Sequence, residues 1–149
     1  MRGWIAVLVV TLVTCGGTDP VDGYLTELEL VTQRLTDESA SALPSGSPPT
    51  HEGVAGVVQA QRNALTAIEG LEPPDELVAE HLALMTVLGD FVAATEKFVA
   101  ETASLEPDDF LRSLEASTDI DVLAGRVAEA CDAMRVRARV LGHVADLEC

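Results

Sequence analysis

Three histidines and three cysteines carry most of the chemistry that this sequence offers. His51-Glu52 begins like the HExxH motif of zinc proteases, but Ala55 stands where the second histidine is required, which excludes that site. His81 has Val78 three residues before it instead of the glutamate of an ExxH motif, so a di-metal site of that type is excluded as well. We predict that His81 is a partly buried or boundary residue of a helix.

His143 and Asp146 have a spacing that allows two side chains to share a cation. They stand as a solitary pair after the end of a predicted helix, so we interpret them as residues without a metal. The chain also lacks CxxC, a phosphate-binding glycine loop and GxSxG. We therefore predict no catalytic residue, no cofactor and no metal ligand, and we expect that the protein is not an enzyme.

Cys131 and Cys149 are predicted to form a disulfide if the chain is exported, because exported proteins fold in an oxidising compartment. In one continuous helix their Cα atoms would lie about 27 Å apart, whereas a disulfide needs about 4.4 to 6.8 Å. The chain must therefore reverse, and Gly142 is placed to end the helix and begin the return. The alternative is that Cys131 is a small core residue and Cys149 a frayed end.

The N-terminal segment has the parts of an export signal in order. Arg2 supplies one positive charge, an uncharged apolar run follows up to Thr14, and small residues begin at Cys15. The run is too short for a transmembrane helix, which needs about 20 residues. The block Leu12-Val13-Thr14-Cys15 resembles the lipobox of bacterial lipoproteins, in which the cysteine is acylated and the chain is cut before it.

The lipobox resemblance implies that Cys15 carries lipid and holds the protein at the extracytoplasmic face of the cell membrane. Thr14 departs from the pattern, which usually has Gly, Ala or Ser before the cysteine. Cleavage by an ordinary signal peptidase is therefore the alternative. Lipid anchoring is firm when two or more acyl chains are attached, because each buried methylene contributes about 0.8 kcal/mol.

The chain is strongly acidic, with a net charge of −16 at pH 7. Such a field repels DNA and RNA, so nucleic acid is excluded as a partner. The predicted partners are the membrane, through the lipid on Cys15, and a protein of the cell envelope. Four basic residues fall on the last predicted helix, where they either complement the helix dipole or form a local anion- or partner-binding patch. These are Arg126, Arg135, Arg137 and Arg139.

Apolar residues at steps of three and four predict helices along the rest of the chain and no strand. Thr50 is the predicted N-cap of the second helix, and Gln61 interrupts its apolar stripe. The predicted helices cover residues 24–35, 51–72, 74–101, 106–114 and 120–141. In the longest of them the apolar stripe lies at Val78, Leu82, Met85, Leu88, Val92, Thr95 and Val99.

These helices predict an all-α fold, an antiparallel bundle of three to four helices over residues 23–149. The remaining parts of the chain are a signal peptide over residues 1–14 and a tether over 15–22. A loop rich in Ser and Pro is predicted within the bundle domain, over residues 37–50.

Three stretches of the chain resemble short helical lipoproteins of actinobacteria. In that group a first helix led by tyrosine is followed by a Leu-x-Pro-Pro turn into a long helix, and cysteines stand near the end of the last helix and at the C-terminus. The matching residues are Tyr24-Leu25, Leu71 to Leu77, and Cys131 with Asp146-Leu147-Glu148-Cys149. The resemblance implies extracytoplasmic localisation, a helical fold and the cysteine pair, and it implies no particular activity.

Two functions follow from these observations. The first is a membrane-anchored, non-catalytic lipoprotein that acts as a protein- or envelope-interaction module, because no constellation of nucleophile, base and metal is found. The alternative is a lipoprotein that binds a small ligand or a cation between its helices, where helical bundles place their sites.

Overall fold

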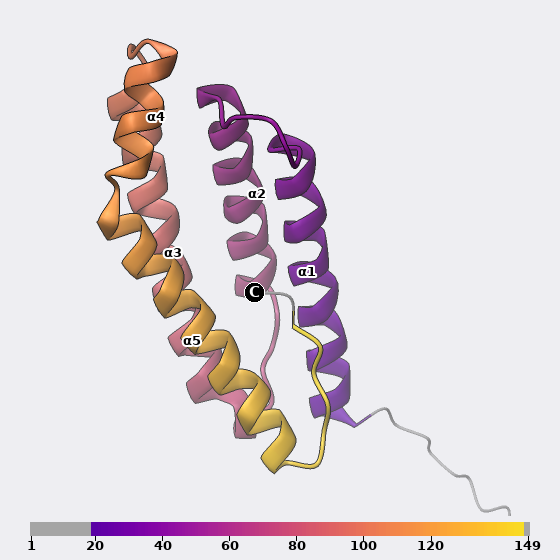
Figure 1. The fold of residues 1–149 in the computed structure, drawn as a ribbon. Coiled ribbons are helices and arrows are strands. Elements are labelled where there is room, and N and C mark those ends of the chain that lie inside the picture. Colours follow the sequence, from indigo (N-terminus) through magenta and orange to yellow (C-terminus); the bar gives the residue numbers. More distant parts are fainter. Residues whose placement is uncertain (1–18, 148–149) are drawn as a thin grey trace, which may run out of the picture.

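The computed structural model describes residues 19–147, and it is helical with no strand in that range (Figure 1). The predicted all-α class is therefore confirmed. The range holds five α-helices, four long and one short, and each overlaps one of the five predicted helical segments. They are α1 (Pro20–Ala42), α2 (His51–Glu69), α3 (Val78–Thr102), α4 (Pro107–Glu115) and α5 (Thr118–Val140). The predicted signal peptide, Cys15 and Cys149 lie outside the described residues.

Helix α1 is longer at both ends than the sequence predicted. It begins at Pro20 because the Asp19 carboxylate accepts a hydrogen bond from the Val21 N–H at 2.9 Å, and proline is suited to the first helical position. Residues 20–22, which were assigned to the predicted tether, therefore belong to α1. At the other end the helix continues to Ala42, so the loop predicted over 37–50 covers only residues 43–50.

The last turns of α1 continue because the first turns of α2 pack closely against them. A β-carbon placed on Gly56 would lie 2.8 Å from the Ala42 Cβ, and one on Gly53 would lie 2.6 Å from the Leu43 side chain. Only glycine permits this approach of the two backbones. Thr50 caps α2 as predicted, because its hydroxyl accepts a hydrogen bond from the Gly53 N–H at 3.0 Å.

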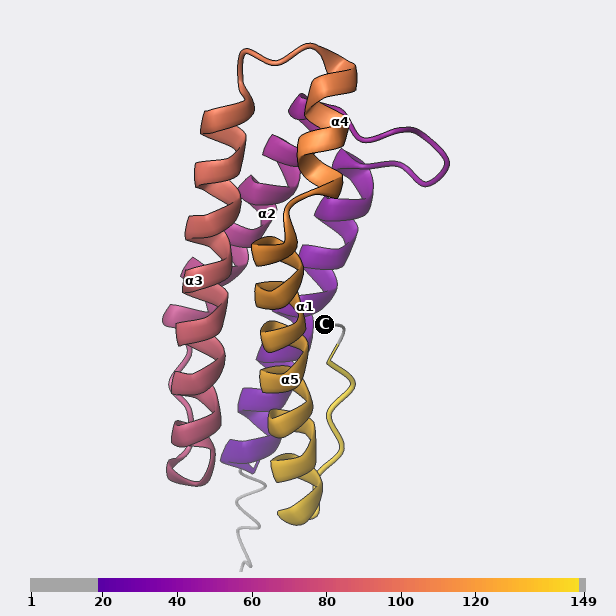
Figure 2. The same ribbon diagram turned by 60° about the vertical axis from the view of Figure 1, so that its left-hand side comes forward.

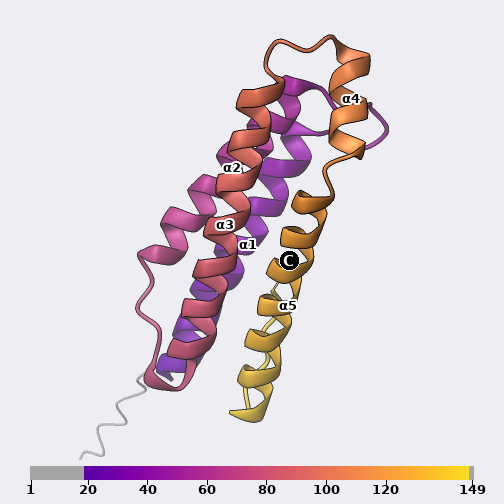
Figure 3. The ribbon, with the colours of Figure 1, turned by 90° about the vertical axis from the view of Figure 1, so that its left-hand side faces the viewer.

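Successive long helices point in alternating directions along the molecule (Figures 1 and 2). Helix α1 packs against α2, α2 against α3, and α3 against α5. No comparable packing joins α1 to α5 within residues 19–147, so that side is not closed by helices. Short α4 lies at the end of the molecule where α3 ends and α5 begins (Figure 3).

The C-terminal segment reverses direction and returns along the side between α1 and α5 (Figure 1). Helix α5 ends at Val140, and Gly142 follows with φ of +90°, a conformation that favours glycine. The predicted reversal at this glycine is confirmed. Leu147 is 2% exposed and joins the same apolar core cluster as Cys131, so the returning segment, which we call the C-terminal strap (residues 143–147), is packed into the fold.

Helix α3 differs from its prediction in where it begins and in the face that it buries. A 3₁₀ turn at Asp75–Leu77 precedes the α-helix, which was predicted to begin at Pro74. Leu82, assigned to the apolar stripe, is 58% exposed, while Leu84 is 2% exposed. The first turns of α3 are apolar on nearly every side, so the spacing of apolar residues did not define one face.

The stretch Asp75–Thr102 has the length and hydropathy of a membrane span by composition, with a mean hydropathy of 1.6 in its most apolar window. It is the one such stretch among residues 19–147. In the fold it is the central helix, packed against α2 on one side and α5 on another.

Candidate functional site

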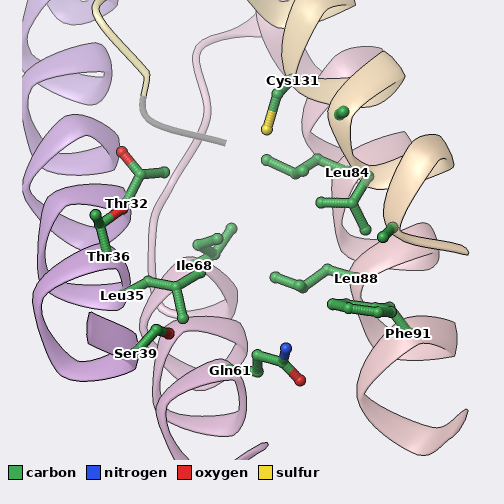
Figure 4. A pocket seen from close by; sticks show the side chains of 13 residues that line it. Thr32, Leu35, Thr36, Ser39, Gln61, Ile68, Leu84, Leu88, Phe91 and Cys131 are labelled. Atoms are coloured by element: carbon green, nitrogen blue, oxygen red, sulfur yellow. The ribbon is translucent and has the colours of Figure 1, made fainter. Parts of the chain in front are cut away.

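A cavity of about 360 Å³ lies among the four long helices, on the side where α1 and α5 are not packed together. Helix α1 contributes four of its lining residues: Thr32, Leu35, Thr36 and Ser39. The other three helices supply mainly apolar side chains. Among these are Ile68, Leu84, Leu88 and Phe91 (Figure 4), together with Val127. Among residues 19–147, no Asp, Glu, Lys, Arg or His lines the cavity.

The polar lining groups differ in how fully they are hydrogen-bonded. Thr32 donates its hydroxyl to the Glu29 carbonyl at 3.1 Å, so it is satisfied within its own helix. Gln61 is 8% exposed, and its Oε1 accepts a hydrogen bond from the Thr95 hydroxyl at 3.1 Å. The sequence marked Gln61 only as an interruption of an apolar stripe. That interruption was the signal of a polar group directed into the interior.

The C-terminal strap is fixed to α1 by polar contacts beside the cavity. His143 Nδ1 lies 2.5 Å from Asp22 Oδ1, and the Asp146 backbone N–H donates to Glu29 Oε1 at 2.7 Å. Of the pair whose spacing would allow a shared cation, His143 therefore contacts α1 through its ring, and Asp146 contacts α1 through its backbone. Among residues 19–147, no group of three or more His, Cys, Asp or Glu side chains is placed to hold a metal ion.

Cys131 lines the cavity and is 3% exposed, which places it in the core as both sequence interpretations allow. It is not a free side chain in the structure. Cys149 lies outside the described residues, so the pairing of the two cysteines stays a prediction. The strap nevertheless brings Leu147 back into the core cluster that contains Cys131.

His51 and His81 both have structural partners. His51 Nε2 donates to the Val99 carbonyl at 2.8 Å, and its ring meets Phe110 of α4 with centroids 5.6 Å apart. His81 was predicted to be partly buried, but it is 7% exposed and lies in the interior. Its Nδ1 is 3.0 Å from the Tyr24 hydroxyl, which joins α3 to α1.

Burial shifts both members of the Tyr24–His81 pair toward their neutral forms. It raises the pKa of Tyr24 to about 12 and lowers the pKa of His81 below its ordinary value of 6.5. A neutral imidazole and a neutral phenol can share one hydrogen bond without burying a charge. The pair therefore acts as an uncharged link inside the core, and not as an acid–base couple at the cavity.

We expect the stability of the protein to fall as the pH drops below about 6.5, because the unfolded chain then binds a proton on His81 before the folded chain does. Above that pH both states hold a neutral ring, and the His81 contribution is constant. Replacing His81 with glutamine should remove this part of the pH dependence. Thermal unfolding of both proteins between about pH 8 and pH 5 measures the difference. Identical pH profiles would contradict the assignment.

The arginines of α5 do not form one patch. Arg135 donates to Asp132 Oδ1 at 2.6 Å, and Arg137 donates to the Glu76 carbonyl at 3.1 Å. Arg126 lies nine residues before Arg135, a rotation of about 180° on an α-helix, so these two arginines are on opposite sides of α5. This arrangement favours local pairing and dipole effects over a single anion-binding surface.

Comparison with protein-family models, with curated proteins and with solved structures finds no match to this chain. The cavity among α1, α2, α3 and α5 is the candidate site on the strength of its own geometry. Three of the residues named in the sequence analysis line it: Cys131, Gln61 and Leu88 of the predicted apolar stripe.

Proposed function

We propose that the protein is an extracytoplasmic lipoprotein, anchored through an acylated Cys15, whose helical bundle binds a small apolar ligand between α1 and α5. The observation that carries the proposal is the cavity of about 360 Å³, to whose lining the described part of the chain contributes no ionised side chain. Ligand sites in proteins commonly fall between about 300 and 1,000 Å³ and are predominantly apolar.

The bundle architecture supports this function. In the antiparallel arrangement that we propose, three sides are closed by helix packing, and the fourth is bridged by the C-terminal strap in place of a helix pair. The wall side chains next to an empty apolar cavity lack contact partners on one side. An apolar ligand restores those contacts and removes its own surface from water.

The anchor keeps one end of the bundle near the membrane. Asp19 is the fourth residue after Cys15, so the chain between them reaches at most about 14 Å. The end of the molecule that holds the start of α1 is therefore the end closest to the lipid. A protein at this position meets apolar molecules that leave the membrane.

A second candidate is the envelope-interaction module. Three exposed valines at the end of α5 and in the strap favour it: Val136, Val140 and Val144 are 55%, 71% and 90% exposed. Val136 and Val140 are one helical turn apart and share a side of α5. Val136 is five residues after Cys131, a rotation of about 140° on an α-helix. A partner protein that covers the valines would therefore bind another side of α5 and leave the proposed ligand site in place.

Labelling with radioactive palmitate tests the anchor. The wild-type chain made in a bacterium with lipoprotein-processing enzymes should be labelled and recovered with membranes. Cys15→Ser should be unlabelled and recovered in the soluble extracytoplasmic fraction. An unlabelled wild-type chain would contradict the anchoring.

Binding of the neutral dye Nile red tests the cavity. We expect saturable binding by wild type and a loss of about tenfold or more in affinity for Ala128→Phe, which fills the cavity from α5. Ala133→Phe is the matched control, because Ala133 is exposed on the same helix, as Ala128 is, but does not line the cavity. Equal losses in the two variants, or no saturable binding by wild type, would contradict the function.

A further inference from the structure

We infer that the Gln61 side-chain amide is the polar recognition group of the cavity, and that the ligand is a hydrocarbon bearing an uncharged carbonyl, such as an ester, ketone or amide. This inference rests on the proposed ligand-binding function and specifies the chemistry of the ligand.

Gln61 has a hydrogen-bond donor that the protein does not use. The residue is 8% exposed and lines the cavity. Its Oε1 lies 3.1 Å from the Thr95 hydroxyl, which also reaches the Phe91 carbonyl at 2.9 Å. Its Nε2 has no partner among residues 19–147 and keeps accessible surface at the cavity. An unused NH₂ group that can be reached from the cavity points to an acceptor supplied by whatever fills it.

The location of Gln61 sets how such a ligand would lie. Figure 4 shows Gln61 and Ser39 toward one end of the cavity and Cys131 toward the other, with Leu84 and Leu88 along the wall. A carbonyl oxygen at the Gln61 end would leave the hydrocarbon along the leucines. The ligand thus has one polar position and one apolar body, which matches the division of the lining.

Charge limits the choice of acceptor. A carboxylate in the cavity would be buried without a cation, because no Lys, Arg or His of residues 19–147 lines it. Such burial is strongly unfavourable. The net charge of −16 on the chain also repels an anion. An ammonium group offers donors only, so it cannot pair with the Gln61 NH₂. An uncharged carbonyl is the group that fits both the donor and the absence of charge.

Displacement of Nile red by three related ligands tests the inference on the wild-type protein. We use methyl decanoate, n-tridecane with the same number of heavy atoms, and decanoate. We expect methyl decanoate to bind about 3- to 10-fold more tightly than n-tridecane, the gain of one hydrogen bond. Decanoate should bind most weakly. If methyl decanoate and n-tridecane bind equally, Gln61 is not a recognition group, although the ligand-binding function stands. If no ligand displaces the dye, the proposed function fails.

Two variants identify the donor. Gln61→Met keeps the size of the side chain and removes both polar atoms, so it should lower the affinity for methyl decanoate about 3- to 10-fold and leave that for n-tridecane unchanged. Ser39→Ala removes the neighbouring hydroxyl and should preserve the preference for the ester. A preference that survives Gln61→Met, or is lost in Ser39→Ala, overturns the assignment to Gln61. The wild-type ligand series remains decisive if Gln61→Met does not fold.

Discussion

Replacing Leu28 with alanine should lower the free energy of unfolding by about 3 to 5 kcal/mol. The Leu28 side chain is completely buried in the core cluster, on the face of α1 directed into the fold. Truncation removes its apolar surface from the core and leaves a void that the surrounding helices fill only in part. Because single domains are stable by only about 5 to 15 kcal/mol, this loss is a large share of the total.

Leu30 on the same helix provides the matched control. Leu30 lies two residues after Leu28 and is 63% exposed, so Leu30→Ala removes the same atoms from a site that is mostly in water. We expect a change within about 0.5 kcal/mol. Urea denaturation of both variants measures the difference. Similar losses in both variants would contradict the orientation of α1.

Local chemistry explains why most helix boundaries were predictable. Thr50 caps α2, Pro107 opens α4, and Gly142 ends α5, each as expected. These signals act within a few residues of one another, so they can be read without knowing the fold. The end of α1 was missed because residues 37–42 become helical in contact with α2, at Gly53 and Gly56, and that contact is not local.

The buried face of α3 could not be predicted because its apolar residues do not form one stripe. Leu82 and Leu84 are equally apolar, and only the positions of α2 and α5 decide that Leu84 is buried. His81 was missed for the same reason, since its partner Tyr24 is on another helix. The spacing of apolar residues predicts that a helix is present, whereas packing against other helices decides which of its faces is buried.

The candidate site depends on four helices, and its sequence signal was weak. Cys131 was selected for its chemistry with Cys149, and its position on the cavity wall was not expected. Gln61 appeared only as a polar residue in an apolar stripe. A cavity arises where side chains from different helices do not fill the space between them. Its position therefore cannot be predicted from any single stretch of the sequence.

Replacing Cys149 with serine should lower the free energy of unfolding by about 3 kcal/mol if it is bridged to Cys131. A disulfide that closes a loop of about this length restricts the unfolded chain by that amount. The fold supports the geometry, because the chain turns at Gly142 and Leu147 is already buried in the cluster of Cys131. The predicted bridge would then hold the strap closed beside the cavity.

Reductant separates the bridge from simple packing of the strap. Wild type in reductant should lose the same stability as Cys149→Ser, and Cys149→Ser should not respond to reductant. Leu147→Ala removes the packing and keeps both cysteines, so it should lower stability by about 2 to 5 kcal/mol, with or without reductant. In the double variant the two losses should be non-additive, because both changes release the same segment. A wild-type protein that is insensitive to reductant and no more stable than Cys149→Ser would show that the strap is held by Leu147 and its contacts with α1 alone.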